Sequence, residues 1–289
     1  MTDVNHGVLH GALPIPTPRV YLLDVEGTVA PIAFVSEQLF PYARAHFEQF
    51  LWQNEKETEQ REARGEDVLA EGSVWRDLMA LGAENRMETG EDAPRIWPAP
   101  ENAAGRNAVE QAGTPRMISM SPAEAIPKFL EYIFWLMDRD RKSTALKSLQ
   151  GKIWKAGFES GELKGTLFDD VPEALARWSA AGKVAIYSSG SVEAQRLVFR
   201  HSIFGDLTGM ISNYFDTRTG AKGDAASYAA IAAAMGVAPD AVIFFSDVVR
   251  ELDAAREARC RTCLMMRAGN AKVDDAHGHR VIDTFEQEI

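Results

Sequence analysis

An apolar run that ends in two carboxylates and a glycine is the feature that most constrains this chain. Val20–Leu23 is followed directly by Asp24, and Glu26, Gly27 and Thr28 come next. Such a run predicts a buried strand, and open α/β sheets bind ligands at the carboxyl ends of parallel strands. Gly27 would let the backbone turn sharply, so that amides and Thr28 can face a phosphate.

The two carboxylates suit phosphoryl transfer through an aspartate. Asp24 would be the nucleophile, while Glu26 would give a proton to the leaving oxygen and later take one from the hydrolytic water. A solvated turn would also accommodate this short pattern, so the hypothesis depends on finding other parts of a site.

A second apolar run ends in hydroxyls and glycine. Val184–Tyr187 leads into Ser188-Ser189-Gly190-Ser191, and the helical pattern Val192–Arg200 follows. Hydroxyls and free amides at the start of a helix form an anion site. The alternative is that Ser191 only caps the helix.

Two further elements follow along the chain. Lys222 lies in a loop-like stretch before the alanine-rich helical pattern Tyr228–Met235, and Asp247 ends another apolar run. An aspartate at such a strand end, close to another aspartate, predicts a hard-oxygen site for Mg²⁺. A solvated surface charge is the alternative for Lys222, and a helix N-cap is the alternative for Asp247. Glu251 and Asp253 are candidates for outer contacts of the metal site.

The fixed order of acid pair, hydroxyl loop, lysine and Ser-Asp resembles the haloacid dehalogenase superfamily. The chain more closely resembles the enolase-phosphatase E1 family of methionine salvage, from about Val20 to about Asn270. Most phosphatases of the superfamily have an aspartate at the position of Glu26, whereas the enolase-phosphatases have glutamate. The stretches that carry this closer resemblance are Leu22–Thr28, Ile32–Arg44, Asp138–Gly151, Tyr187–Gln195 and Tyr214–Thr217.

The resemblance implies roles for individual residues of a site that holds one Mg²⁺ per subunit. Asp24 would be nucleophile and metal ligand, and Glu26 would be the general acid/base and a metal contact through its backbone carbonyl. Lys222 would neutralise the phosphate and position Asp24, and Asp247 would complete the metal site. The residues implied to bind substrate are Ser188, Ser189, Lys222, Thr28 and Gly190.

The resemblance also implies a bifunctional reaction. The family enolises 2,3-diketo-5-methylthiopentyl-1-phosphate and then removes its phosphate through an aspartyl-phosphate, which gives the acireductone 1,2-dihydroxy-3-keto-5-methylthiopentene. Glu26 is the simplest candidate for taking the carbon-bound proton, and Glu37 is the alternative. Another Mg²⁺-dependent phosphatase of the same superfamily is the second hypothesis, and a non-catalytic binding protein on the same fold is the third.

The expected fold is a three-layer, Rossmann-like haloacid dehalogenase core with a parallel sheet, plus a mainly helical cap inserted after the first strand. We expect a flexible tail at 1–17, the core at 18–31 and 166–289, and the cap at 32–165. The cap would hold the substrate away from bulk water. The strands expected from apolar runs are Val20–Val25, Val184–Tyr187, Met210–Ser212, Val242–Phe245 and Thr262–Met266.

Two stretches of the expected cap have helical periodicity, Phe34–Trp52 and Ala123–Ser148. Between them, residues 54–121 are rich in Glu, Gly, Ala and Pro, which predicts a loop or disordered insertion. Its acidic run Glu55–Glu66 is interpreted as a solvated helix face.

The composition limits the classes of partner and the cellular compartment that we expect for this protein. The formal net charge of −11 disfavours nucleic acid, because no basic stripe is present to displace counterions. We expect no membrane partner, since no apolar stretch approaches the roughly 18 residues that span a bilayer, and we expect no secretory signal. Cys260 and Cys263 are interpreted as structural, and so few cysteines suit a reducing compartment. The protein is expected in the cytoplasm, with the nucleus as a further location, and the resemblance implies a monomer.

Overall fold

The computed structural model describes residues 19–97 and 120–287, which divide into two compact units. Within that described part, the sheet unit is drawn from Met1–Pro31, Leu167–Gln195 and Asp206–Ile289, and the helical unit from Ile32–Thr166 and Arg196–Gly205. The junctions lie within one residue of those expected between core and cap, but the segment Arg196–Gly205 groups with the helical unit. The expected tail at 1–17 lies outside the described residues.

The sheet unit alternates strands with helices, as βα units of a parallel sheet require. Its order is β1 (Val20–Leu23), α6 (Val171–Ala181), β2 (Lys183–Tyr187), α7 (Val192–Arg200, which ends in the helical unit), β3 (Asn213–Phe215), α8 (Ala225–Met235), β4 (Val242–Ser246), α9 (Val249–Glu257), β5 (Arg261–Met265) and β6 (Arg280–Ile282).

All six strands form one parallel sheet in the order β3-β2-β1-β4-β5-β6. The central strand β1 pairs with both β2 and β4, and Leu23 lies opposite Ile186 on one side and Phe245 on the other. Because the strands are parallel and in this register, the residues that follow β1, β2 and β4 meet at one edge of the sheet.

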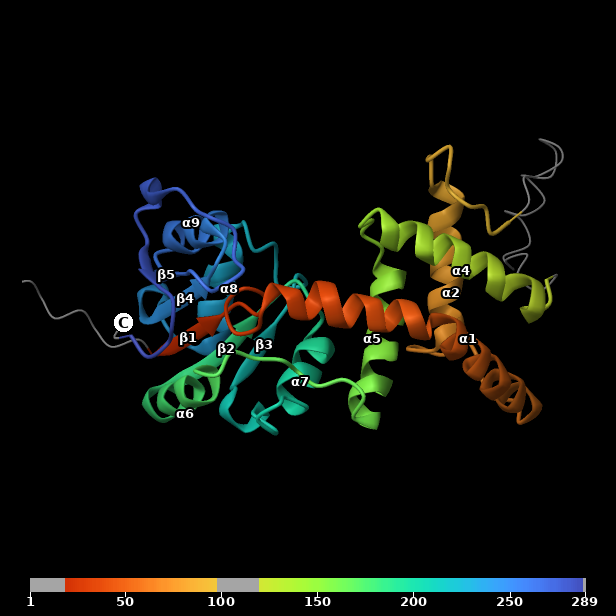
Figure 1. Cartoon of the computed structure of the whole chain (residues 1–289), viewed down its shortest axis with the longest axis horizontal. Coiled ribbons are helices and arrows are strands. Elements are labelled where there is room, and N and C mark those ends of the chain that lie inside the picture. Colours follow the sequence, from red (N-terminus) through yellow and green to blue (C-terminus); the bar gives the residue numbers. More distant parts are fainter. Residues whose placement is uncertain (1–18, 98–119, 288–289) are drawn as a thin grey trace, which may run out of the picture. The chain divides into compact units, whose positions relative to one another are not determined.

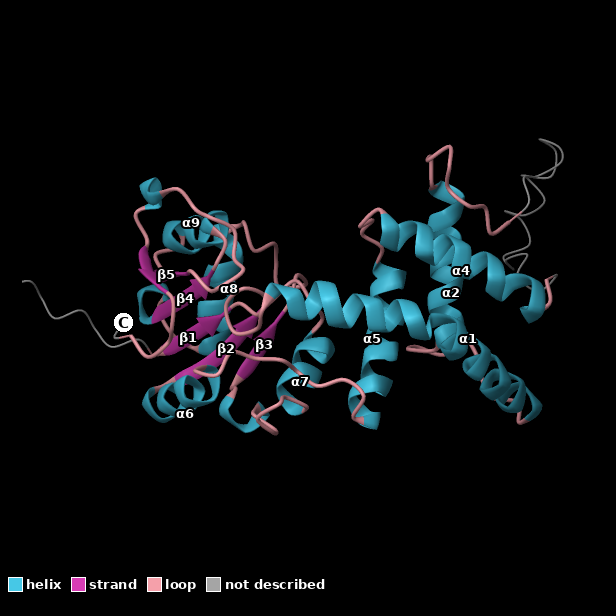
Figure 2. Ribbon diagram, in the orientation of Figure 1, coloured by secondary structure: helices cyan, strands magenta, loops and turns pink. Residues whose placement is uncertain are grey.

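Helices cover both faces of this sheet, which explains why its central strands are continuous apolar runs (Figures 1 and 2). On one face, Tyr228 and Ile231 of α8 and Leu252 of α9 are buried in a cluster with the strands. On the other face, Trp178 of α6 stacks on Tyr21, with 4.9 Å between ring centroids. The expected three-layer α/β core with a parallel sheet is confirmed.

Two details of the expected sheet are wrong or missing. The strand expected at Met210–Ser212 is displaced, because Thr208–Met210 forms a 3₁₀ turn and β3 begins at Asn213. The edge strand β6 was not expected, since it has three residues and exposes two of them, Arg280 and Val281. It therefore offers no apolar run. The other four strands were placed correctly to within two residues at either end.

The described helical unit contains a π-helical turn (Phe34–Leu39) and the helices α1 (Phe40–Ala63), α2 (Val74–Met87), α4 (Pro122–Asp138) and α5 (Thr144–Ser160). Their apolar faces bury a common core that includes Phe47, Leu78, Phe129 and Leu149. The helix expected at Phe34–Trp52 is confirmed and continues to Ala63, although its first turns are π-helical.

The single helix expected over Ala123–Ser148 is wrong, because the chain breaks between α4 and α5. Asp140 has a positive φ of 46°, which an α-helix does not allow. Ser143 then starts α5 as its N-cap, and its hydroxyl accepts a hydrogen bond from the amide of Leu146.

The loop expected over 54–121 is also wrong for the part that the structure describes. Residues 54–63 belong to α1, and none of their side chains is buried, which confirms the solvated helix face expected for the acidic run as far as Ala63. Helix α2 follows with Leu78 and Leu81 buried. Beyond α2, the buried Asn85 side chain holds the backbone of Pro94 and Ile96. These apolar positions lie among many charged residues, which hid their helical spacing. Residues 98–119 lie outside the described part.

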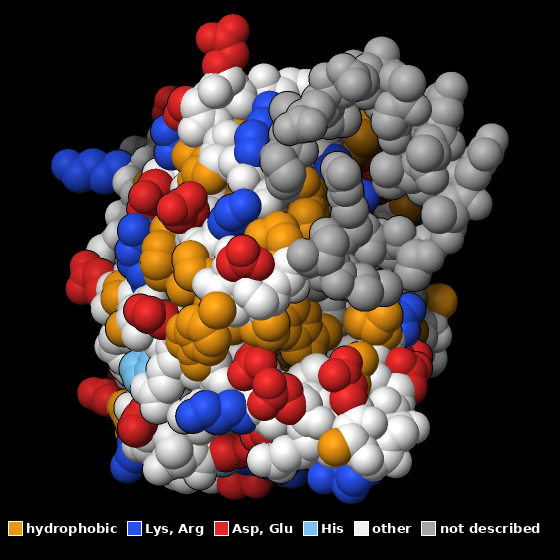
Figure 3. Space-filling model, turned by 90° about the vertical axis from the view of Figure 1, so that its right-hand side faces the viewer, with side chains coloured by type: hydrophobic (Ala, Val, Ile, Leu, Met, Phe, Trp, Pro, Cys, Tyr) orange, Lys and Arg blue, Asp and Glu red, His pale blue; other side chains and the backbone are white. Residues whose placement is uncertain are grey.

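Acidic and basic side chains are interspersed around hydrophobic ones on the face drawn in Figure 3. Among the described residues, no helix is long and apolar enough to cross a membrane. Cys260 and Cys263 are buried free thiols whose pKa is raised to about 12 by burial, which agrees with a structural role.

Candidate active site

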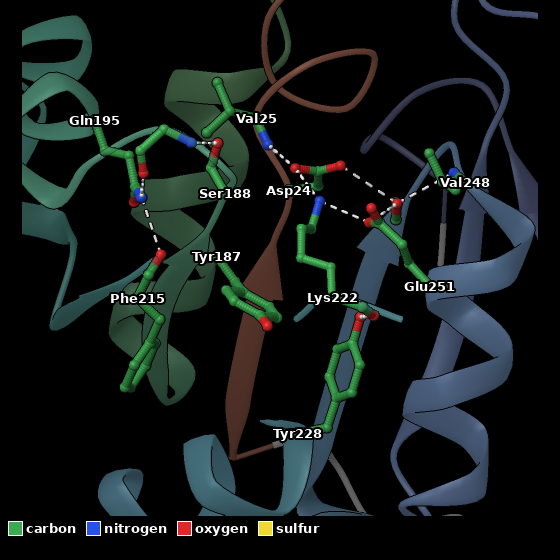
Figure 4. A network of polar contacts seen from close by, with 12 residues as sticks. Asp24, Val25, Tyr187, Ser188, Gln195, Phe215, Lys222, Tyr228, Val248 and Glu251 are labelled. Atoms are coloured by element: carbon green, nitrogen blue, oxygen red, sulfur yellow. Dashed lines mark hydrogen bonds and ion pairs between the residues drawn. The ribbon is translucent and has the colours of Figure 1, made fainter. Parts of the chain in front are cut away.

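Asp24 is buried where the central strand ends, and its carboxylate has a fixed orientation. The amide of Val25 donates to Oδ1 over 2.7 Å, and the Ser246 hydroxyl lies 3.3 Å from Oδ2 (Figure 4). The backbone amide of Asp24 donates to the Phe245 carbonyl, which continues the pairing of β1 with β4. Asp24 is therefore held by the strand geometry that its sequence position predicts.

Lys222 reaches this carboxylate from the loop before α8. Its Nζ lies 2.7 Å from Asp24 Oδ1 and 2.6 Å from Glu251 Oε2, and its side chain is only 10% exposed. The hydroxyl of Tyr228 donates to the Lys222 carbonyl and so fixes the backbone from which the side chain extends. Burial alone would lower the pKa of Lys222, but the carboxylates of Asp24 and Glu251 outweigh it and raise that pKa. Lys222 is thus a permanent cation in contact with Asp24, not a solvated surface charge.

Glu251 and Ser246 complete the cluster from β4 and α9. The Ser246 hydroxyl lies 3.0 Å from Glu251 Oε2 and accepts the amide of Val248. Burial and the Asp24 carboxylate raise the pKa of Glu251, while Lys222 opposes them. Glu251 therefore lies beside Asp24, as an outer-contact candidate should.

The other outer-contact candidate does not join this cluster. Asp253, on the same helix, forms an ion pair with Arg256 and lies 3.2 Å from His279 Nε2 instead. Ser246 was not predicted as a site residue; its only sequence signal was its position immediately before Asp247.

Asp247 follows β4 and carries a perturbed carboxyl group. Burial and the charge of Asp24 raise its pKa to about 6. The helix-cap alternative is not supported, because the N-cap residue of α9 is Val248 and no side chain caps that helix. Among the described residues, no basic side chain forms an ion pair with Asp247.

The donor set fits a magnesium ion. The carboxylates of Asp24 and Glu251 contact the single ammonium of Lys222, and the third carboxylate, Asp247, has no such contact, so the cluster when fully ionised carries two negative charges in excess. In the described part of the chain, no three His, Cys, Asp or Glu side chains form a complete metal cage. Mg²⁺ does not need one, because it usually binds one or two carboxylates together with waters and a substrate phosphate.

The hydroxyl loop after β2 lies beside Asp24 in Figure 4. Ser188 is buried and accepts the amide of Gly190 over 3.2 Å, whereas Ser189 is exposed. Ser191 caps α7 by accepting the amide of Ala194, so the capping role considered for this residue is present. The loop therefore has one hydroxyl turned into the protein and one open to solvent.

Gln195 also supports this loop, although the sequence analysis assigned it no role and placed it only at the end of the stretch Tyr187–Gln195. Its side-chain amide donates to the carbonyls of Gly190 and Phe215, over 2.8 and 2.9 Å, and so ties the loop to β3.

The turn Glu26–Thr28 follows Asp24 directly. Gly27 has a φ of +67°, in the region that favours glycine, and its amide donates to the Ala30 carbonyl over 2.8 Å. Glu26 is half-buried. Thr28 is fully buried, and its hydroxyl has no hydrogen-bond partner among the described residues. A buried hydroxyl of this kind needs a partner, so Thr28 fits a role toward a bound anion.

A parallel sheet with a buried aspartate after its central strand, a lysine ion-paired to it and a second aspartate on the next strand is the arrangement of a haloacid dehalogenase-like hydrolase. The sequence matches that family over residues 18–259. The crystal structure of the UTR4 protein of Saccharomyces cerevisiae has a TM-score of 0.64 and 29% identity, covering 94% of this chain and 100% of that one.

The curated relatives identify the narrower family. The chain is 46% identical to enolase-phosphatase E1 of Synechococcus elongatus, over 91% of this chain and 94% of the relative. It is 40% identical to enolase-phosphatase E1 of Leptospira borgpetersenii (93% and 97%) and 36% identical to that of Danio rerio (96% and 97%). The chain therefore belongs to the enolase-phosphatase E1 family, which confirms the resemblance found in its motifs.

Proposed function

We propose that this protein is the Mg²⁺-dependent enolase-phosphatase that converts 2,3-diketo-5-methylthiopentyl-1-phosphate to the acireductone 1,2-dihydroxy-3-keto-5-methylthiopentene and phosphate. The observation that carries the proposal is the buried Asp24 carboxylate, held 2.7 Å from Lys222 Nζ and close enough to Asp247 to raise its pKa. The names of its relatives support the reaction class, enolase-phosphatase, and the substrate is the one that the family resemblance implies.

The phosphatase half uses two carboxylates in sequence. An Asp24 oxygen attacks the phosphorus, the bond to the substrate oxygen breaks, and Glu26 protonates that oxygen. Water then attacks the phosphorus of the aspartyl-phosphate, gives its proton to Glu26 and releases phosphate. Because Oδ1 of Asp24 accepts from both Val25 and Lys222, the attacking group is oriented before the substrate arrives.

The remaining residues hold charge in place. Lys222 remains an ammonium at neutral pH, so it offsets negative charge on the phosphoryl group throughout the transfer. Ser188, Ser189 and the amide of Gly190 would bind phosphate oxygens. Asp24, Asp247 and the carbonyl of Glu26 would hold Mg²⁺, which when bound supplies Lewis-acid polarisation of substrate oxygens in both half-reactions.

Three further expectations belong to this proposal. Residues 32–165 would act as a cap that excludes bulk water, Glu26 or Glu37 would take the carbon-bound proton, and the enzyme would work as a monomer in the cytoplasm or the nucleus. The chemistry supports the first, because an acyl-phosphate must meet one ordered water rather than bulk solvent.

The test follows enediol absorbance and free phosphate together, using purified protein, Mg²⁺ and the diketone phosphate. We expect both signals from the wild type and no phosphate from Asp24→Asn. The matched control is Asp253→Asn, an aspartate ion-paired to Arg256 outside the cluster, which should retain both.

Each other outcome is informative. Release of phosphate without an enediol signal would indicate another phosphatase of the superfamily. If both signals are absent, a binding protein is favoured. Phosphate release by Asp24→Asn would place the nucleophile elsewhere.

A further inference from the structure

The segment that follows β5 forms hydrogen bonds with the turn after Asp24. The side-chain amide of Asn270 donates to the Gly27 carbonyl over 2.9 Å and to the Met265 carbonyl over 3.0 Å. Three residues earlier, Arg267 Nε donates to the Thr28 carbonyl over 3.2 Å. Two successive carbonyls of the turn are thus held by one segment from the other end of the chain.

Arg267 makes this segment rigid. Its guanidinium forms two hydrogen bonds with the Asp170 carboxylate, over 2.8 and 3.0 Å, and both side chains are less than 10% exposed. The rings of Phe168 and Phe285 pack against the guanidinium. The backbone amide of Asn270 donates to the Arg267 carbonyl, so Asn270 is fixed relative to Arg267.

The orientation of the Asn270 side chain follows from its partners. Both groups that it contacts through nitrogen are carbonyls, which only accept hydrogen bonds, so the NH₂ end must face them and Oδ1 must face away. That oxygen is buried and has no donor among the described residues. A β-carbon built on Gly27 would lie 3.1 Å from Asn270 Oδ1 and 2.6 Å from Asp247 Cγ. The oxygen therefore borders the same small space as the Asp247 carboxylate.

Asn85 shows what a purely structural asparagine looks like in the same chain. It is 1% exposed, more deeply buried than Asn270, its nitrogen donates to the Pro94 carbonyl over 2.8 Å, and its oxygen accepts the Ile96 amide over 3.0 Å. Both ends are satisfied. Asn270 differs because only its nitrogen end is satisfied within the protein, while its oxygen end faces Asp247.

We propose that Asn270 is a positioning residue for the reaction. Through the Gly27 carbonyl it fixes the turn that carries Glu26 and Thr28, and through Oδ1 it accepts a hydrogen bond from a water molecule beside Asp247. This inference rests on the proposed function, because it assigns the turn and Asp247 to that site. Without Asn270, the peptide between Gly27 and Thr28 loses the hydrogen bond to its carbonyl and keeps the one from the Thr28 amide to the Val25 carbonyl, so the turn between Glu26 and Thr28 is held less firmly.

The test compares Asn270→Ala and Asn270→Asp with Asn85→Ala as the matched control. Three quantities are measured on the whole chain: kcat and KM with the diketone phosphate, binding of Mg²⁺ alone by calorimetry, and hydrogen exchange of the amides of residues 26–30. For Asn270→Ala we expect kcat and Mg²⁺ affinity to fall roughly 10- to 100-fold, as for other residues that support metal ligands. Exchange at 26–30 should become faster, and KM should change less than kcat.

The two other variants separate positioning from stability and from charge. Asn85→Ala should lower the melting temperature but leave kcat, Mg²⁺ binding and exchange at 26–30 as in the wild type. Asn270→Asp turns an acceptor toward the two carbonyls, so it should not restore kcat, even though it adds a negative charge near Asp247. If Asn270→Asp instead binds Mg²⁺ more tightly and keeps wild-type kcat, the positioning role is wrong.

Other results would also overturn the inference. The inference is wrong if Asn270→Ala has the kcat, Mg²⁺ binding and hydrogen exchange of the wild type. It is also wrong if Asn270→Ala and Asn85→Ala behave identically. Calorimetry and exchange need no substrate. If the wild type fails to act on the diketone phosphate while Asn270→Ala still weakens Mg²⁺ binding and frees residues 26–30, the proposed function fails and the positioning role stands.

Discussion

Replacing Gly27 by alanine tests the geometry of the site through a single methyl group. Gly27 has a φ of +67°, and its missing side chain leaves room for the Asp247 carboxylate. A β-carbon there would lie 2.6 Å from Asp247 Cγ, and ordinary contact begins at 3.4 Å. Asp247 would have to retreat by about 0.8 Å, or the turn after Asp24 would have to move by the same amount.

The magnitude has two parts. A left-handed conformation costs an L-residue about 1–2 kcal/mol, of which about 0.4–1 kcal/mol is offset because alanine also restricts the unfolded chain. Overpacking against Asp247 adds about 1–3 kcal/mol. We therefore expect Gly27→Ala to lower the free energy of unfolding by about 2–4 kcal/mol. Misplacing a reacting group by nearly 1 Å can cost about 100-fold in rate, so phosphate release should fall on that order.

The control is Gly65→Ala. Gly65 has a φ of +72°, and a β-carbon there would have no neighbour within 4 Å, so this change has only the conformational part, about 1 kcal/mol or less. Urea unfolding measures both variants, and titration of phosphatase activity with Mg²⁺ shows whether Asp247 has moved. If Gly27→Ala loses no more stability than Gly65→Ala and keeps the wild-type Mg²⁺ midpoint, the close packing of Gly27 on Asp247 is wrong.

Two further predictions concern buried ion pairs. Lys222→Met should abolish phosphate release and lower the free energy of unfolding in urea by about 3–5 kcal/mol, because Asp24 and Glu251 lose their shared cation. The double variant with Glu251→Gln should recover part of that stability but no activity. A loss of stability below about 1 kcal/mol in Lys222→Met would contradict the pairing. Burial would raise the pKa of Asp170, but the Arg267 guanidinium and hydrogen-bond donors outweigh it and lower that pKa. The carboxylate therefore contributes stability above the unfolded pKa of 3.8, and this contribution is lost as pH falls through the lower folded pKa. The stability gap between wild type and Asp170→Asn should be constant near neutral pH and should close under acid; a gap that widens below pH 3.8 would contradict this sign.

The core of the fold was predictable because its signals are local. Apolar runs marked β1, β2 and β4, and each ends in a polar residue that a buried strand does not need: Asp24, Ser188 and Asp247. Parallel strands place such ends together, so their convergence followed from the fold class alone. The resemblance then supplied the roles that spacing could not.

The contacts that complete the site were not predictable, because they join positions far apart in the chain. Glu251 meets Lys222 only because α9 packs beside α8, and Asn270 reaches Gly27 across 243 positions. The sequence indicated that Glu251 lies near the site but not that it pairs with Lys222, and it gave no sign of the contact between Asn270 and Gly27. Helix α2 was missed for a different reason: its buried residues are separated by charged ones, and composition outweighed periodicity in a region rich in Glu and Gly.

The charges of the site explain why its substrate and its metal must be considered together. Two excess negative charges lie where a phosphate would bind, and two like unit charges about 4 Å apart repel by about 4 kcal/mol at an effective dielectric of about 20. Lys222 offsets only part of the negative charge, because its single ammonium is shared between Asp24 and Glu251. A divalent cation held by Asp24 and Asp247 would cancel the two excess charges and so remove this repulsion. The same cluster that holds Asp24 in place would thus disfavour a phosphate that arrives without a cation.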